Sequence, residues 1–245
     1  MGTGNKRHAA EGYRGNFDMW RRRRYLVAAG GLAALSGCLG GDDDDDGGNG
    51  DGEDEVPDIY ASATSLGGEQ RNPDELTPKA DVQFSEYAEA TEKEAHVDGT
   101  CCANCADYII DKNGDGIGAC AEVAGAVDRE DWCTLWEELP EPAVPDGMTE
   151  EELATAEVPQ PYRTADSQGG EARDPDNLSP QSAVSLGESV EAIADGTTEA
   201  GQSCGNCAEY IPDKNGDGWG ACAKVEGYIA VEDWCSIWEH VTEAL

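Results

Sequence analysis

The chain is short of basic residues, with 16 lysines and arginines against 52 aspartates and glutamates and a formal net charge of −36. Seven of these basic residues precede Cys38, so the rest of the chain is more acidic still. This balance argues against nucleic acid as a partner, because nucleic-acid binding needs basic patches that neutralise phosphates. It indicates a solvated acidic surface that suits a salt-loving organism, since molar salt screens charges over about 3 Å.

The chain also lacks the residues of a common catalytic site. It has three histidines, His8, His96 and His240, and they do not form a ligand set. No Ser-His-Asp, Cys-His or paired-carboxylate arrangement is evident, so we predict that the protein is not an enzyme. Large apolar side chains are scarce, and a domain of about 80 residues with so few of them has a marginal core unless a metal or a crosslink supports it.

The sequence repeats itself once. Residues 60–136 align without a gap with residues 162–238, and about half of the aligned positions are identical. Solenoid repeats run about 20–50 residues, so a unit of this length indicates a duplicated domain. We predict a first domain over 56–137, a linker rich in proline and glutamate over 138–157, and a second domain over 158–245.

Secondary-structure signals inside these domains are weak. Short helices are predicted over 85–94 and 187–194, while glycine, proline and asparagine elsewhere predict turns and small β pieces. The predicted fold class is therefore a small α+β domain, present twice and organised around a centre other than a large apolar core, which the cysteines described below would supply as ligands of a metal cluster.

The N-terminal segment has the pattern of an export signal. The basic block Arg21–Arg24 precedes an apolar stretch that is too short to span a membrane. The block resembles a twin-arginine signal, and Leu35-Ser36-Gly37-Cys38 resembles a lipobox. We predict a signal peptide over 1–37, lipidation of Cys38, and a disordered acidic linker over 38–55. The alternative is that Cys38 is an ordinary cysteine of a cleaved signal.

Eight of the ten cysteines form two quartets with the same spacing, C-x2-C-x14-C-x12-C. The quartets are Cys102, Cys105, Cys120 and Cys133, and Cys204, Cys207, Cys222 and Cys235. Each could hold a [4Fe–4S] cluster or a structural zinc ion, or could form disulfides if the protein is exported. Zinc sites usually have a second tight cysteine pair, which is missing here. Disulfides leave the recurring tryptophan, tyrosine and glycine around the cysteines unexplained.

The residues around the quartets resemble the high-potential iron–sulfur protein family. The similarity lies in the C-x-N-C pair, the Gly-Ala-Cys at the third cysteine and the Trp-Cys at the fourth, in both repeats. A tyrosine well before the cysteines packs on the cluster in that family, and Tyr60 and Tyr162 match its position. The resemblance implies two tandem domains, each with one [4Fe–4S] cluster on its quartet. The aromatic cover it implies comprises Tyr60, Tyr108, Trp132 and Trp136 in the first repeat, and Tyr162, Tyr210, Trp234 and Trp238 in the second.

The chemistry implied by the resemblance is one-electron transfer. A four-thiolate cluster carries about −2 when reduced and about −1 when oxidised, and a buried site disfavours a further negative charge. We therefore expect a carrier that uses the 3+/2+ couple in an aerobic or respiratory electron transport chain. Its partners would be redox proteins, met at the outer face of the cell membrane to which Cys38 anchors it. The alternative is a disulfide-stapled, lipid-anchored binding module without a redox role.

Two further features invite other interpretations. The segments 111–116 and 213–218 both read Asp-Lys-Asn-Gly-Asp-Gly, which matches the start of a calcium-binding EF-hand loop. A cluster cysteine interrupts each loop, and an acidic Asn-Gly turn explains both segments. Cys101 has no cysteine counterpart, because Ser203 stands at its position in the second repeat, and we interpret it as a spare thiol.

Overall fold

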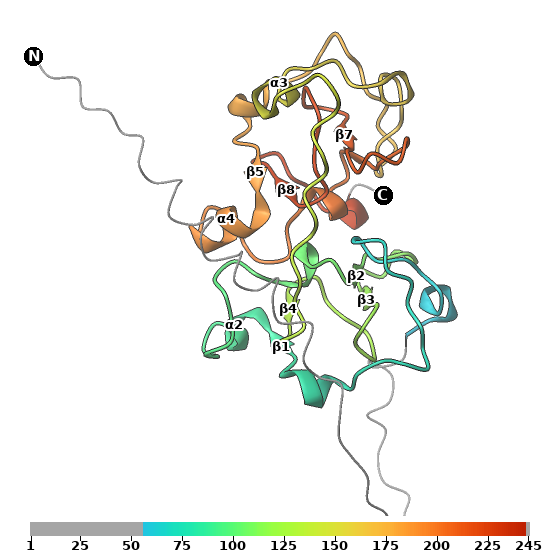
Figure 1. Ribbon diagram of the computed structural model, residues 1–245, viewed down its shortest axis with the longest axis vertical. Helices are drawn as coiled ribbons and strands as arrows, with labels where there is room; N and C mark the ends of the chain where they lie inside the picture. The colour runs from blue at the N-terminus through green and yellow to red at the C-terminus, as the bar shows by residue number, and fades with distance from the viewer. Residues whose placement is uncertain (1–55, 244–245) are drawn as a thin grey trace, which may run out of the picture. The chain divides into compact units, whose positions relative to one another are not determined.

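The computed structural model describes residues 56–243 (Figure 1). The predicted signal peptide, Cys38 and the acidic linker all lie outside the described residues. Within 56–243, no helix is long and apolar enough to cross a membrane.

The first repeat is built from very short elements joined by turns. Its two antiparallel strand pairs are β1 (Ser85–Glu86) with β4 (Asp131–Trp132), and β2 (Tyr108–Ile109) with β3 (Ala119–Cys120). In the second pair Tyr108 lies opposite Cys120. The helices are α2 (Tyr87–Ala90) and the 3-10 turns η1 (Asp58–Tyr60), η2 (Lys79–Val82) and η3 (Cys102–Asn104).

The second repeat has a counterpart of each of these elements at the equivalent position, as its sequence similarity to the first predicts, and one further turn near its end. Strands β5 (Gly187–Glu188) and β8 (Asp233–Trp234) form one pair, and β6 (Tyr210–Ile211) and β7 (Ala221–Cys222) form the other. Its helices are α4 (Ser189–Ala194), η4 (Gln160–Tyr162), η5 (Gln181–Ala183), η6 (Cys204–Asn206) and η7 (Val241–Glu243). Helices α2 and α4 lie within the two spans that the sequence predicts as helical, and the remaining elements agree with a small α+β fold.

The core of each repeat is centred on its cysteines. In the first repeat the four cysteines pack with Val82, Tyr108, Val123 and Val127, and in the second with Val184, Tyr210, Val225 and Ile229. Smaller apolar clusters lie beside them, among them one formed by Tyr60, Ala63, Ile109 and Ala119. Because each repeat has few large apolar side chains, the cluster that contains its four cysteines is the main part of its core.

The segment 138–157, which the sequence predicts as a linker, contains the helix α3 (Glu150–Leu153). Its start is fixed by a capping box, in which the Glu152 carboxylate accepts the Thr149 backbone N–H at 2.8 Å. Leu153 is buried and packs with Tyr162 and Tyr228 of the second repeat. Part of this segment therefore contributes to the core of the second repeat, because its one apolar helical position finds a partner there.

Candidate metal centre

Each quartet is assembled from three short segments. In the first repeat Cys102 begins η3 and Cys105 follows it, Cys120 ends β3, and Cys133 follows β4. The pairing of Tyr108 with Cys120 brings the third cysteine back beside the first pair. All eight cysteines are buried, and the nine described cysteines, Cys101 included, are free thiols.

The four cysteines of each quartet line a cavity of their own, one in each repeat. The remaining walls are largely apolar, with Phe84, Tyr108, Val123, Val127, Leu135 and Trp136 in the first, and Leu186, Tyr210, Val225, Ile229 and Ile237 in the second. In residues 56–243 no three histidine, cysteine or acidic side chains converge closely enough to hold one metal ion. Zinc would require ligands about 2.3 Å from a single centre, so sulfurs spaced around a cavity fit a larger iron–sulfur cluster better.

The thiols of both quartets would lose their protons only when a metal centre is bound. Burial raises the pKa of Cys120 and of Cys222 to about 12 and that of Cys235 to about 11, and it raises the pKa of the other five thiols as well. Such thiols stay protonated until a metal centre supplies positive charge, since burial disfavours the isolated thiolate. The donor set therefore fits a metal-bound state in which the ligands are deprotonated together.

Asn104, which is buried, holds the loop that carries the first two cysteines. The Asn104 side-chain oxygen accepts the Cys101 backbone N–H at 2.9 Å and the Trp136 indole N–H at 3.0 Å. The Asn104 amide group in turn donates to the Gly99 carbonyl at 2.9 Å. Asn206 makes the equivalent bonds in the second repeat. We did not assign this role from sequence, although identity of the asparagine in both C-x-N-C pairs is the signal that marks it.

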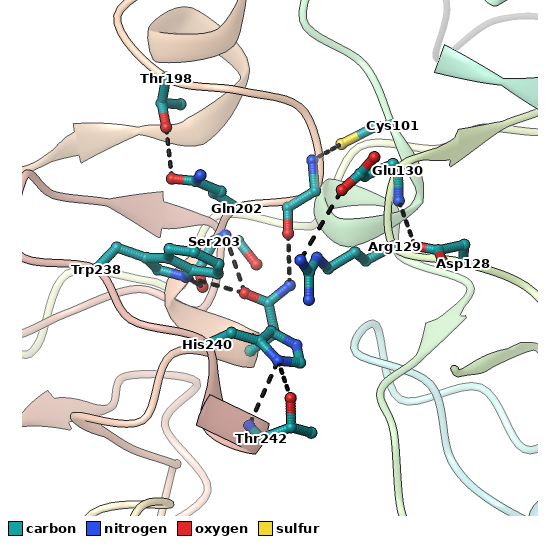
Figure 2. A network of polar contacts seen from close by, with 12 residues as sticks. Cys101, Asp128, Arg129, Glu130, Thr198, Gln202, Ser203, Trp238, His240 and Thr242 are labelled. Atoms are coloured by element: carbon teal, nitrogen blue, oxygen red, sulfur yellow. Dashed lines mark hydrogen bonds and ion pairs between the residues drawn. The ribbon is translucent and has the colours of Figure 1, made fainter. Parts of the chain in front are cut away.

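The tryptophans that follow the quartets are placed differently from those that precede the fourth cysteine. Trp136 lines the first cavity, and Trp238 packs against the second cysteine cluster with its indole N–H on the Ser203 carbonyl at 2.8 Å (Figure 2). Trp132 stacks edge-on against His96, and Trp234 donates to the Gln202 side chain at 2.9 Å. Neither Trp132 nor Trp234 is among the residues that line the cavities.

The tyrosines also separate into two groups. Tyr108 and Tyr210 line the two cavities. Tyr60 instead packs with Ile109 and Ala119, and its hydroxyl accepts the Lys112 N–H at 2.9 Å and lies 2.9 Å from the Ile117 carbonyl, to which it donates. Tyr162 has the equivalent bonds. The geometry therefore supports Tyr108 and Tyr210, rather than Tyr60 and Tyr162, as the tyrosines that lie against the sulfurs.

The loops with the calcium-like sequence are closed by their own backbone. One Asp111 oxygen accepts the N–H groups of Asn113 and Gly114, and the other accepts that of Gly116 at 2.8 Å. Burial alone would raise the Asp111 pKa, but these bonds hold it below its ordinary value. Both carboxylate oxygens are thus engaged inside the turn, as the Asn-Gly turn interpretation expects.

A buried arginine lies beside each quartet. Arg71 is 6% exposed, and its guanidinium donates to the Cys120 carbonyl at 2.5 Å and to the Val123 carbonyl at 3.1 Å. Arg173 is 5% exposed and donates to the Val225 carbonyl at 3.4 Å. Sequence analysis did not single out these arginines, although both are kept at the same position of the repeat. The arrangement places a fixed positive charge next to each set of sulfurs.

These features define a class of protein, a small domain in which four buried cysteines surround a largely apolar cavity. A family model for high potential iron-sulfur protein matches residues 73–140 and 183–242, which together make up just over half of the chain. The chain therefore belongs to the high potential iron-sulfur protein family and carries two copies of its domain. Members of this family are iron–sulfur electron carriers that bind a [4Fe–4S] cluster. Searches among curated proteins and among solved structures gave no match.

Proposed function

We propose that the protein is a one-electron carrier with one [4Fe–4S] cluster in each repeat. The observation that carries this proposal is that both quartets surround a buried, largely apolar cavity at matched positions. When bound, such a cluster supplies one-electron exchange between its 2+ and 3+ cores. The residues that would hold it are Cys102, Cys105, Cys120 and Cys133 in the first repeat, and Cys204, Cys207, Cys222 and Cys235 in the second.

The residues around each quartet would determine which redox couple the cluster uses. The apolar walls exclude water and disfavour a third negative charge on the centre, which favours the 3+/2+ couple. Backbone N–H groups point at the sulfurs, with Glu122 N donating to Cys120 Sγ and Lys224 N donating to Cys222 Sγ, each at 3.4 Å. Such bonds stabilise the more negative, reduced state and therefore raise the potential.

Iron content tests the number of clusters. Purified protein is expected to be brown and to contain about eight iron atoms per chain, the sum of two four-iron clusters. Cys133→Ser should remove about half of that iron, because the second quartet is untouched. Zinc in place of iron would contradict the proposal. Colourless protein whose thiols are all oxidised would instead support the alternative, a disulfide-stapled binding module.

We also propose that the carrier works in a respiratory chain at the outer face of the cell membrane, held there by a lipid on Cys38. The supporting observations are the twin-arginine-like block and the lipobox-like Leu35-Ser36-Gly37-Cys38. Redox proteins in or near the membrane would be its partners.

Replacing the proposed lipidated residue tests this location. Cys38→Ser is expected to move most of the protein from the membrane fraction to the soluble fraction, with iron content unchanged. The reason is that Cys38 lies far in sequence from both quartets, while a lipid chain supplies about 0.8 kcal/mol of membrane affinity per buried CH₂. Fractionation with iron analysis measures both effects. A variant that stays with the membrane after its signal is removed would show that another element anchors the chain.

A further inference from the structure

The loops that carry the first ligand pair of each repeat lie against each other. The Ser203 hydroxyl donates to the Ala103 carbonyl at 3.0 Å, and the Gly201 N–H donates to the Cys101 sulfur at 3.4 Å. Figure 2 shows the Cys101 sulfur directed at the backbone of the second repeat next to Ser203. Cys101, Ala103 and Ser203 are each at most 1% exposed, so the contact excludes water.

Two glycines, one in each repeat, allow this close contact between the repeats. A side chain at Gly99 would overlap the Val190 carbonyl of the second repeat, and one at Gly201 would lie 2.6 Å from Glu130 Cγ of the first. Both glycines have positive φ, 85° and 87°, which other residues rarely adopt. The contact continues outward, where the Arg129 guanidinium of the first repeat lies 5.8 Å from the centre of the Trp238 ring (Figure 2).

The contact joins one ligand of each quartet by a short path. Cys102 is bonded to Ala103 and Cys204 to Ser203, so a single hydrogen bond connects the two ligand-bearing segments. Because each ligand is one Cα step of about 3.8 Å from this hydrogen-bonded pair, the Cα atoms of Cys102 and Cys204 lie within about 16 Å. Electron transfer falls steeply with distance and is faster through bonds than across gaps, which makes this contact a direct route.

The two quartets differ in the charge beside their third ligand. Glu122 stands two residues after Cys120, whereas Lys224 stands two residues after Cys222 and pairs with Glu171. Both side chains belong to partly exposed residues, so salt weakens their effect without removing it. A carboxylate disfavours the more negative reduced state and an ammonium group favours it. These charges would therefore give a cluster in the first repeat the lower potential.

We propose that the chain is an internal relay, in which electrons pass from the first repeat to the second through the contact between 101–103 and 201–203. One electron leaves the first centre, which is oxidised from 2+ to 3+, and enters the second, which is reduced from 3+ to 2+; no bond breaks and no proton moves. This inference rests on the proposed function, because it requires a cluster in both repeats. It makes the first repeat the site of entry and the second the site of exit.

Electron paramagnetic resonance on the full chain tests the proximity. The oxidised centre is paramagnetic and the reduced centre is not, so two nearby centres interact only when both are oxidised. The fully oxidised protein is expected to show a split or broadened signal that sharpens on partial reduction. Two independent signals at every oxidation level, in protein with about eight irons, would overturn the relay alone. Fewer irons would overturn the proposed function and the relay with it.

Exchange between the repeats tests the path. In half-oxidised protein, line shapes in proton magnetic resonance should show exchange whose rate does not depend on protein concentration. Ser203→Ala should slow this exchange several-fold, whereas Ser167→Ala should leave it unchanged. Ser167 is the matched control because it is also buried in the second repeat, but its hydroxyl bonds to Glu171 N within that repeat. Exchange that scales with concentration would overturn the relay.

A charge swap tests the direction. A redox titration should show two one-electron steps, with Glu122→Lys raising the lower one and Lys224→Glu lowering the higher one. The double variant should reverse the order of the two domains, because each then carries the other's charge. Iron content and the resonance signal show whether both centres remain. If Glu122→Lys instead raises the potential of the higher step, the assigned direction of electron flow, from the first repeat to the second, is wrong.

Discussion

Replacing Arg71 with glutamine is expected to lower the reduction potential of the first centre by about 59 mV, a tenfold change in the equilibrium for a one-electron couple. Within residues 56–243 the Arg71 guanidinium donates to the backbone carbonyls of Cys120 and Val123. Burial lowers the pKa of Arg71 and the nearby Cys120 opposes that shift, yet an arginine stays charged in proteins. A buried charge is costly without a counter-ion, and no ion pair of Arg71 occurs within residues 56–243, so the proposed negative cluster would serve as its counter-ion.

The sign follows from the charges of the two redox states. The reduced centre carries one more negative charge than the oxidised centre, so a nearby cation stabilises the reduced state more and raises the potential. Removing the cation therefore makes reduction harder. A redox titration that follows the colour or the resonance signal of the oxidised centre measures the change.

Three further variants separate charge from packing. Arg71→Lys keeps the charge and should restore most of the potential, whereas Lys93→Gln removes a partly exposed charge of the same repeat and should change little. Arg173→Gln should shift the second centre instead of the first. Equal potentials in Arg71→Gln and the unmodified protein, with full iron content in both, would show that Arg71 acts only through its bonds to the backbone.

Replacing Tyr108 with alanine is expected to shorten the lifetime of the oxidised first centre several-fold, because water then reaches the sulfurs. Tyr108 is 3% exposed, lines the cavity and lies opposite Cys120 in the strand pair. A side chain at Gly118 would lie 2.7 Å from the Tyr108 hydroxyl, so that glycine lets the ring close over the site. Truncating a buried aromatic side chain also costs about 3–5 kcal/mol of stability. Bleaching after chemical oxidation measures the lifetime, and the second centre serves as an internal reference.

The controls decide between the two groups of tyrosines. Tyr108→Phe keeps the ring and should retain the lifetime, while Tyr210→Ala should transfer the instability to the second centre. Tyr60→Phe removes the hydroxyl that joins Lys112 and Ile117 and should loosen that turn without exposing the sulfurs. If Tyr60→Ala bleaches faster than Tyr108→Ala, the cover inferred from the family resemblance lies at Tyr60 after all.

The family could be recognised from the sequence because its signal is local and occurs twice. Ligand spacing, the C-x-N-C pair and the Trp-Cys step are all read along the chain, and the family match covers both stretches that contain them. Tyr60 and Tyr162 lie before the matched regions, which begin at residues 73 and 183. A similar position in the chain was thus the only evidence for their role, and position does not determine where a side chain points.

The sequence by itself determined the duplicated domain, the two cysteine quartets, the acidic surface and the small α+β class, since each of these depends on composition or on spacing within one segment. The tertiary structure alone decided which aromatics line the cavities, that Arg71 and Arg173 lie beside the sulfurs, and that Ser203 meets Ala103. Arg71 is 49 residues from Cys120 and Ala103 is 100 residues from Ser203, whereas Tyr108 is only 12 residues from Cys120 and is placed opposite it by the strand pairing. In domains with so few large side chains, such contacts form when the turns fold around the four cysteines. They leave no periodic pattern in the sequence from which they could be predicted.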